Sequence, residues 1–169
     1  MKILETERLI LRGLNVDDAE FIFELLNEPA FIRNIGDRGV RNPDDARIYI
    51  LSGPVASYGK HGFGLFAVEC KETGEAVGIC GLLKRDSLDD VDIGFAFLER
   101  FRGKGFATES AAAVLEYGRN ALGIPRIVAI TSPDNEESIR VLGKIGLRFE
   151  KMIRMPGSTE DTRLFVPVS

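Results

Sequence analysis

A short glycine-rich segment carries the clearest chemical signal in this sequence. The stretch Arg100-Phe101-Arg102-Gly103-Lys104-Gly105 follows an apolar run and leads directly into a helical pattern that begins at Phe106. Glycines let the backbone turn sharply and approach a ligand closely, and the free N–H groups of a helix's first turn bind anions. Arg102 and Lys104 add positive charge at the same place. The segment therefore predicts a site for a phosphate-bearing ligand, and a helix-entry turn with solvated charges is the simpler alternative.

Two other phosphate-binding motifs do not fit this segment. The dinucleotide fingerprint requires a third glycine three residues after Gly105, where the chain has Thr108. The P-loop motif requires Ser or Thr after Gly-Lys, whereas Gly103-Lys104 is followed by Gly105. The predicted anion site therefore belongs to neither of these classes.

The elements that must position this segment alternate between strand and helix patterns. Apolar runs typical of strands cover residues 7–12, 65–68, 76–80, 91–98, 126–130, 147–153 and 162–166. Helical spacing covers residues 15–26 up to Pro29, a segment from Asn42-Pro43 to a break or kink at 52–54, and residues 106–122 and 136–145. The runs at 65–68 and 76–80 are close enough to form a hairpin. The chain is therefore expected to be mixed α/β.

Length and charge narrow the class of protein. A chain of 169 residues has the usual size of one domain, so one domain over residues 1–169 is expected. No apolar run approaches the length of a membrane helix, and no secretory signal opens the chain, so we expect a cytoplasmic protein without membrane contact. The formal net charge of −4 argues against a general nucleic-acid binder, and any anion site must be local.

Metal and disulfide chemistry are not expected. Cys70 and Cys80 do not form a close Cys-x-x-Cys pair and read as buried free thiols. His61 is the only histidine, so neither a histidine-rich metal site nor a histidine-based triad can be assembled.

The segment Arg100-x-x-Gly103-x-Gly105 at a strand-to-helix junction resembles the Arg/Gln-x-x-Gly-x-Gly/Ala motif of the GNAT (general-control-related N-acetyltransferase) superfamily. Three further blocks, residues 6–12, 92–95 and 107–109, and the stretch Asn135-x-x-Ser138-x-x-x-Leu142-x-x-x-Gly146-Leu147 resemble its RimJ/RimL branch of ribosomal-protein N-terminal acetyltransferases. The resemblance implies a GNAT-like fold, with a mixed, mostly antiparallel sheet of six to seven strands flanked by about four helices. It also implies acetyl-coenzyme A as co-substrate, an amine acceptor, no metal, and a monomer or homodimer.

The resemblance assigns roles to particular residues. Backbone N–H groups from Arg102 to Ala107 would hold the pyrophosphate, and the strand at 93–95 would pair with the pantetheine arm and polarise the thioester carbonyl. The residues implied to bind the cofactor are Ile93, Gly94, Phe95, Arg100, Arg102, Gly103, Lys104, Gly105, Phe106, Ala107, Thr108 and Asn135. Many relatives protonate the leaving thiolate with a tyrosine, but this chain has none after Tyr117, and Ser138 is the replacement candidate. A helix-surface serine without a catalytic role is the alternative.

The acceptor must be a neutral amine when it attacks. Deprotonation at pH 7 costs about 4.6 kcal/mol for a lysine but only about 1 to 1.4 kcal/mol for an α-amine. Asp92 is the one candidate base, acting through water, although it reads equally as a strand-edge charge. Because the sequence offers so few candidate bases, a protein N-terminal α-amine is the favoured acceptor. The cluster Asp86, Asp89, Asp90 and Asp92 leaves a small polyamine open, and a non-catalytic acyl-coenzyme A sensor is a third reading.

Overall fold

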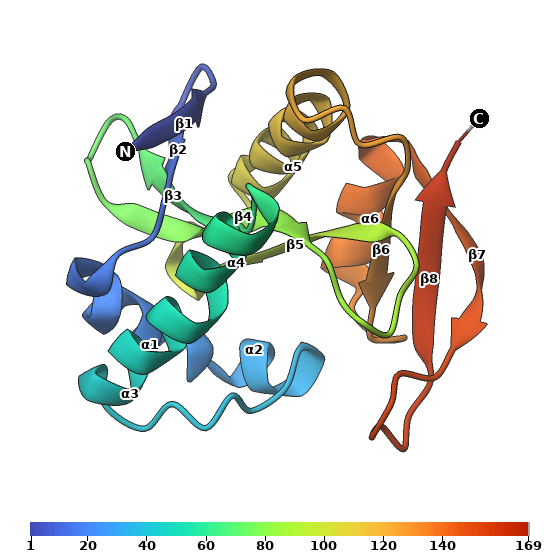
Figure 1. Cartoon of the computed structure of the whole chain (residues 1–169), viewed down its shortest axis with the longest axis horizontal. Helices are drawn as coiled ribbons and strands as arrows, with labels where there is room; N and C mark the ends of the chain where they lie inside the picture. Colours follow the sequence, from blue (N-terminus) through green and yellow to red (C-terminus); the bar gives the residue numbers. More distant parts are fainter. Residues whose placement is uncertain (169) are drawn as a thin grey trace.

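The computed structural model describes residues 1–168 as one eight-stranded sheet with helices against it (Figure 1). The strand order is β1-β2-β3-β4-β5-β6-β8-β7. The strands are β1 (Lys2–Glu5), β2 (Leu9–Arg12), β3 (Leu65–Cys70), β4 (Ala76–Leu83), β5 (Val91–Phe97), β6 (Ile127–Thr131), β7 (Leu147–Ile153) and β8 (Thr162–Pro167). The helices are α1 (Ala19–Leu26), α2 (Pro29–Asn34), α3 (Pro43–Ile50), α4 (Ala56–His61), α5 (Phe106–Glu116) and α6 (Glu136–Lys144). None of these helices is long and apolar enough to cross a membrane.

The predicted mixed α/β class is confirmed, but the predicted counts were too low. The additional strand β1 is a short edge strand, half exposed and paired only with β2, so it lacks the apolar run that marks an inner strand. Pro29 does end α1 as expected, yet it also starts α2 at the first helical position, where its missing N–H removes no hydrogen bond. Beyond α3, the chain stays helical through Pro54 as a π-type turn and continues into α4.

The sheet is covered on both faces. In β3, Phe66 and Val68 belong to the core under α5 and α6, whereas Ala67 belongs to the core under α1, α2 and α3. Side chains alternate between the faces of a strand, so one strand serves both cores. Figure 1 shows α5 and α6 on the opposite side of the sheet from α1, α2 and α3. A ligand that approaches the sheet on the face of α5 and α6 would therefore contact different helices from one that approaches on the face of α1, α2 and α3.

The sheet opens between β5 and β6. These strands are parallel, and they pair only at Val91 with Ile127 and at Asp92 with Val128. Beyond that point β6 pairs with β8, while β5 continues to pair with β4 on its other side. The edge of β5 after Asp92 therefore faces an opening rather than another strand in the part of the chain that is described.

Candidate active site

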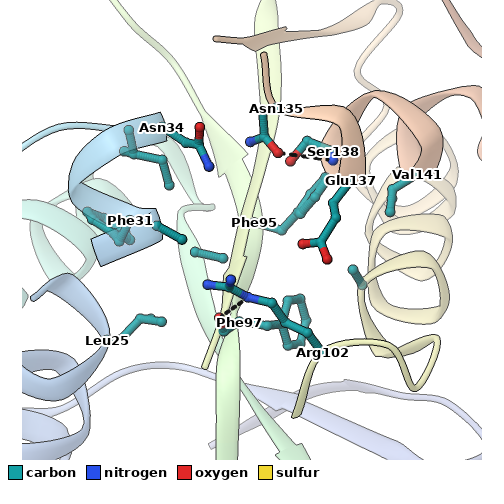
Figure 2. A pocket seen from close by; sticks show the side chains of 14 residues that line it. Leu25, Phe31, Asn34, Phe95, Phe97, Arg102, Asn135, Glu137, Ser138 and Val141 are labelled. Carbon is teal, nitrogen blue, oxygen red and sulfur yellow. Dashed lines mark hydrogen bonds between the residues drawn. The ribbon is translucent and has the colours of Figure 1, made fainter. Parts of the chain in front are cut away.

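The opening between β5 and β6 leads into a small cavity of about 90 Å³. Figure 2 shows Phe95 and Phe97 of β5 between α2, which contributes Phe31 and Asn34, and α6 with its N-cap residue Asn135. A second cavity of about 100 Å³ is also lined by Phe95, Asn135 and Ser138, and reaches Asp92 and Arg85. The sequence-predicted residues from β5 and from the start of α6 thus meet at one place.

The glycine-rich turn presents a run of backbone donors. Gly103 and Gly105 have φ values of +76° and +83°, a left-handed conformation that side-chain-bearing residues rarely adopt. Within residues 1–168, no N–H group from Gly103 to Thr108 donates a hydrogen bond to the protein. Arg102 differs from its predicted role, because its N–H donates to the carbonyl of Glu99 at 3.1 Å. A run of N–H groups without partners in the described chain thus lies where the phosphate cradle is predicted, and it begins one residue later.

The arginine side chains of this turn are engaged with the protein. Arg100 forms an ion pair with Glu24 of α1 and lies over the Phe101 ring. The Arg102 Nε donates to the carbonyl of Phe97 at 3.1 Å (Figure 2). Its Nη2 lies 3.5 Å from Glu28 Oε1. Arg100 lies outside the cavities described here, so its implied contact with a cofactor has no geometric support beyond its place in the turn.

Further cationic side chains lie near the glycine-rich turn, and the sequence analysis did not assign them to the site. Arg140 and Lys144 of α6 line a cavity of about 250 Å³ together with Gly103, Gly105 and Thr108. Arg8 donates to the carbonyl of Lys104 at 2.8 Å and lies over the Phe106 ring. The spacing of Arg140 and Lys144, four residues apart on one helix, was the available signal, because it places both on one face.

Asn135 and Ser138 lie at the start of α6. The Asn135 side chain caps the helix by accepting the Ser138 N–H at 3.3 Å, which leaves its amide nitrogen for another partner (Figure 2). The Ser138 hydroxyl lines both cavities at the opening and has no hydrogen-bond partner within residues 1–168. Tyr117 packs in the core edge-on to Phe66, with ring centroids 6.4 Å apart. Ser138 therefore presents a hydroxyl to the site and Tyr117 does not, while the unpartnered hydroxyl of Thr131 belongs to a residue that lines the second cavity within the described chain.

Asp92 is almost fully buried, with 1% of its surface exposed. Burial raises its pKa, and an ion pair with Arg85, whose Nε lies 3.0 Å from Asp92 Oδ1, opposes the rise. Side chains alternate along β5, and Ala96 packs against the core under α1, α2 and α3, so Asp92 lies on that same face. Asp92 reaches the opening from the side opposite α5 and α6.

A larger groove of about 910 Å³ continues from the opening on the α2 side. Its lining residues come from α2 and the loop after it, from the β4–β5 loop, and from the loop between β7 and β8. Ile32 and Ile35 expose 40% and 42% of their surfaces there, so part of the groove wall is apolar. This groove gives a second molecule a route to the opening from the side away from the glycine turn.

The sheet thus opens beside the glycine-rich turn, and a groove approaches the opening from the far side. The family profile of the acetyltransferase (GNAT) domain matches residues 8–148. This chain belongs to the GNAT acetyltransferase family, and it is an acyltransferase.

Three similar proteins agree with this assignment. The uncharacterized N-acetyltransferase YoaA of Bacillus subtilis (strain 168) is 32% identical over 168 residues, which covers 96% of this chain and 94% of YoaA. A GNAT-family acetyltransferase structure from Bacillus anthracis is 28% identical, with a TM-score of 0.81 over 98% of this chain and 97% of that one. RimL, a ribosomal L7/L12 α-N-protein acetyltransferase solved with coenzyme A, has a TM-score of 0.83 over 99% of this chain and 98% of its own. At 17% identity it supports the fold alone.

Proposed function

We propose that this acetyltransferase moves the acetyl group of acetyl-coenzyme A to a primary amine, and that the acceptor is the α-amine of a protein N-terminus. The observation that carries the proposal is the run of unpartnered N–H groups from Gly103 to Thr108, beside the opening between β5 and β6. Backbone donors at a helix N-terminus suit a pyrophosphate. The unpaired edge of β5 suits an extended amide-containing arm that ends in a thioester.

The reaction then needs three groups of this chain. An N–H of β5 in the segment Ile93–Phe95 would donate to the thioester oxygen as it becomes an oxyanion. Ser138 would pass a proton to the departing thiolate while its oxygen takes one from a solvent water, so that the serine ends as a neutral hydroxyl. Asp92 would accept the amine's proton through water, a role that its raised pKa supports and its ion pair with Arg85 opposes.

Two observations favour an α-amine over a polyamine. Asp92 is paired with Arg85, and Asp90 lies 3.2 Å from Arg126, so half of the acidic cluster is neutralised by local arginines. Arg33, Arg38 and Arg85 also line the groove and offset its acidic residues Asp86, Glu160 and Asp161, so the groove offers a polycation no net attraction. An α-amine needs little help from a base.

A thiol-release assay tests the proposal. Acetyl-coenzyme A is incubated with the protein and with peptides, polyamines or aminoglycosides, and free thiol is followed in time. We expect peptide-dependent release. Thiol release only with polyamines or aminoglycosides would show that the acceptor is a small amine. Cofactor binding without thiol release with any amine would favour a non-catalytic acyl-coenzyme A sensor.

A further inference from the structure

The guanidinium of Arg85 is held by one nitrogen only. Its Nε donates to Asp92, at 3.0 Å from Oδ1 and 3.3 Å from Oδ2. Its two terminal nitrogens have no partner within residues 1–168, although a guanidinium can donate five hydrogen bonds in a fixed fork. Asp92 is buried while the Arg85 side chain is 34% exposed. The buried carboxylate therefore fixes the orientation of a guanidinium that is partly open to solvent. This arrangement leaves the part of arginine that binds carboxylates bidentately available to a ligand.

Arg85 also lies where the acceptor must pass. It lines the inner cavity that contains Phe95, Asn135 and Ser138, and it lines the 910 Å³ groove on the α2 side. A ligand group bound to the terminal nitrogens of Arg85 would therefore sit between the groove and the reacting centre. Because the inner cavity measures only about 100 Å³, a group bound there would be separated from the reacting amine by a few bonds.

A second cation converges on the same place. Arg38, from the loop after α2, lines the groove with Arg85, and both act on the hydroxyl of Tyr49, whose burial raises its pKa against their charges. Within the described residues neither Arg38 nor Arg33 pairs with an acid. On the opposite wall, Asp161 is held by Arg154 at 3.0 Å. Arg33, Arg38 and Arg85 thus form a cationic part of the groove wall, although Asp86 and Glu160 also line the groove.

We infer that Arg85, oriented by Asp92 and joined by Arg38, binds a carboxylate of the acceptor that lies within a few bonds of the acetylated amine. The inference rests on the proposed function and narrows its substrate class to acidic amines. The carboxylate can belong to an acidic residue at a peptide N-terminus or be the α-carboxylate of a free amino acid. Asp92 acts through Arg85 here and is a positioning residue.

Two matched pairs of amines test the inference and separate these sources. A peptide beginning with Asp is compared with the same peptide beginning with Asn, and free alanine is compared with alaninamide. For each, kcat/KM for the acceptor is measured by thiol release, and affinity is measured by calorimetry with and without coenzyme A. We expect the acid to exceed the amide at least about tenfold in one pair, because a charge-assisted bidentate contact is lost with the amide. The pair that responds identifies the source.

Substitutions at Arg85 test whether this residue causes the preference for the acid over the amide. Arg85→Gln should reduce the preference for the acid to about twofold or less, raise the acceptor KM, and leave the KM for acetyl-coenzyme A unchanged. Arg85→Gln leaves a buried carboxylate unpaired and can unfold the protein. The double variant Arg85→Gln with Asp92→Asn removes both charges and should show the same loss of preference, while kcat falls for acid and amide alike because Asp92 is also the proposed base. Arg126→Gln, which breaks the exposed pair with Asp90, is the matched control and should keep the preference.

The outcomes are distinguishable. Amides that react and bind as well as acids in both wild-type pairs would overturn the inference while leaving the proposed function intact. A preference that survives in the folded double variant would also overturn it. No acetylation of any amine would contradict the proposed function, and the calorimetric comparison of acid with amide then decides the inference by itself.

Discussion

At the scale of single residues, Ser138 has the most direct test. Its hydroxyl faces the opening without a partner in the described chain, and we expect Ser138→Ala to lower kcat by about 100-fold or more with little change in the KM for acetyl-coenzyme A. The reason is that a proton given to the leaving thiolate matters in the transition state and not in the bound ground state. Steady-state kinetics with a saturating amine measures both constants.

The neighbouring cap is the control for that variant. Asn135→Ala removes the bond to the Ser138 N–H and should cost about 1 kcal/mol of stability, besides raising the KM for acetyl-coenzyme A. If Ser138→Ala lowers kcat less than several-fold, Ser138 is a bystander and solvent protonates the thiolate.

Two substitutions at Gly103 distinguish the effect of backbone conformation on coenzyme A binding from the effect of charge. Its φ is +76° and a Cβ built there meets no atom within 4 Å, so a side chain is strained but not crowded. Gly103→Ala should cost about 1 kcal/mol and weaken coenzyme A binding modestly. Gly103→Asp adds a carboxylate beside the N–H run and should abolish binding while the protein stays folded. Calorimetry compares the two, and equal affinities would argue against the phosphate cradle.

The two cysteines were expected to be buried free thiols, and this is confirmed. Burial raises the pKa of Cys80 to about 12, so this thiol stays protonated near pH 8 and is shielded from reagents. In a Cys70→Ser background we expect Cys80 to be labelled only after unfolding, followed by mass spectrometry with and without denaturant. Rapid labelling of the folded protein would show that this part of the core opens readily.

At the scale of elements, Arg12 joins β2 to the start of α1. It lies 2.7 Å from Asp18 and 2.5 Å from Glu69, and Asp18 is buried. Arg12→Leu leaves this carboxylate without its partner, and we expect a loss of about 3 kcal/mol in the free energy of unfolding by urea. The exposed pair of Arg154 with Asp161 is the control, because Arg154→Leu should cost less than about 1 kcal/mol. Similar losses in both variants would contradict the role given to burial.

The sequence predicts elements well where one periodicity runs long enough. The helix at 136–145 and the strand at 91–98 agree with α6 and β5 within about one residue. Short elements escape, because α2 spans six residues between a proline and a glycine-rich loop and shows less than two helical turns. Motif residues are found in the same way: Gly103 and Gly105 are recognisable because a left-handed turn requires glycine.

Partners set by tertiary contact cannot be found from the sequence. Nothing near Arg100 reveals that its side chain binds Glu24, since the two lie 76 positions apart. Arg85 belongs to no recognised motif. Its place beside Asp92 is apparent only from the pairing of β4 with β5. The 910 Å³ groove is lined largely by loops, where spacing is not constrained by any periodicity.

At the scale of the whole molecule, a net charge of −4 surrounds a local group of cations at the glycine turn. We expect Arg140→Ala and Lys144→Ala each to weaken coenzyme A binding severalfold in low salt, and the effect to shrink between about 0.05 and 0.5 M salt because exposed charges are screened. Arg102→Ala should have a smaller effect, since its guanidinium already contacts Phe97 and Glu28. Calorimetry across the salt series measures this, and salt-independent losses would indicate lost packing instead.

The sparse pairing of β5 with β6 has a dynamic consequence. Within the described sheet, only two residue pairs of the strand ladder join β1 to β5 to the group β6, β8 and β7, and the shared core under α5 and α6 supplies the remaining contact. The second group can therefore loosen without breaking the ladders of the first. Amide hydrogens in β6 should therefore exchange with solvent through a partial opening that leaves β3 and β4 protected. A molecule lying between β5 and β6 would tie the two groups together, and its slowing of exchange should be greatest on the far side of the gap.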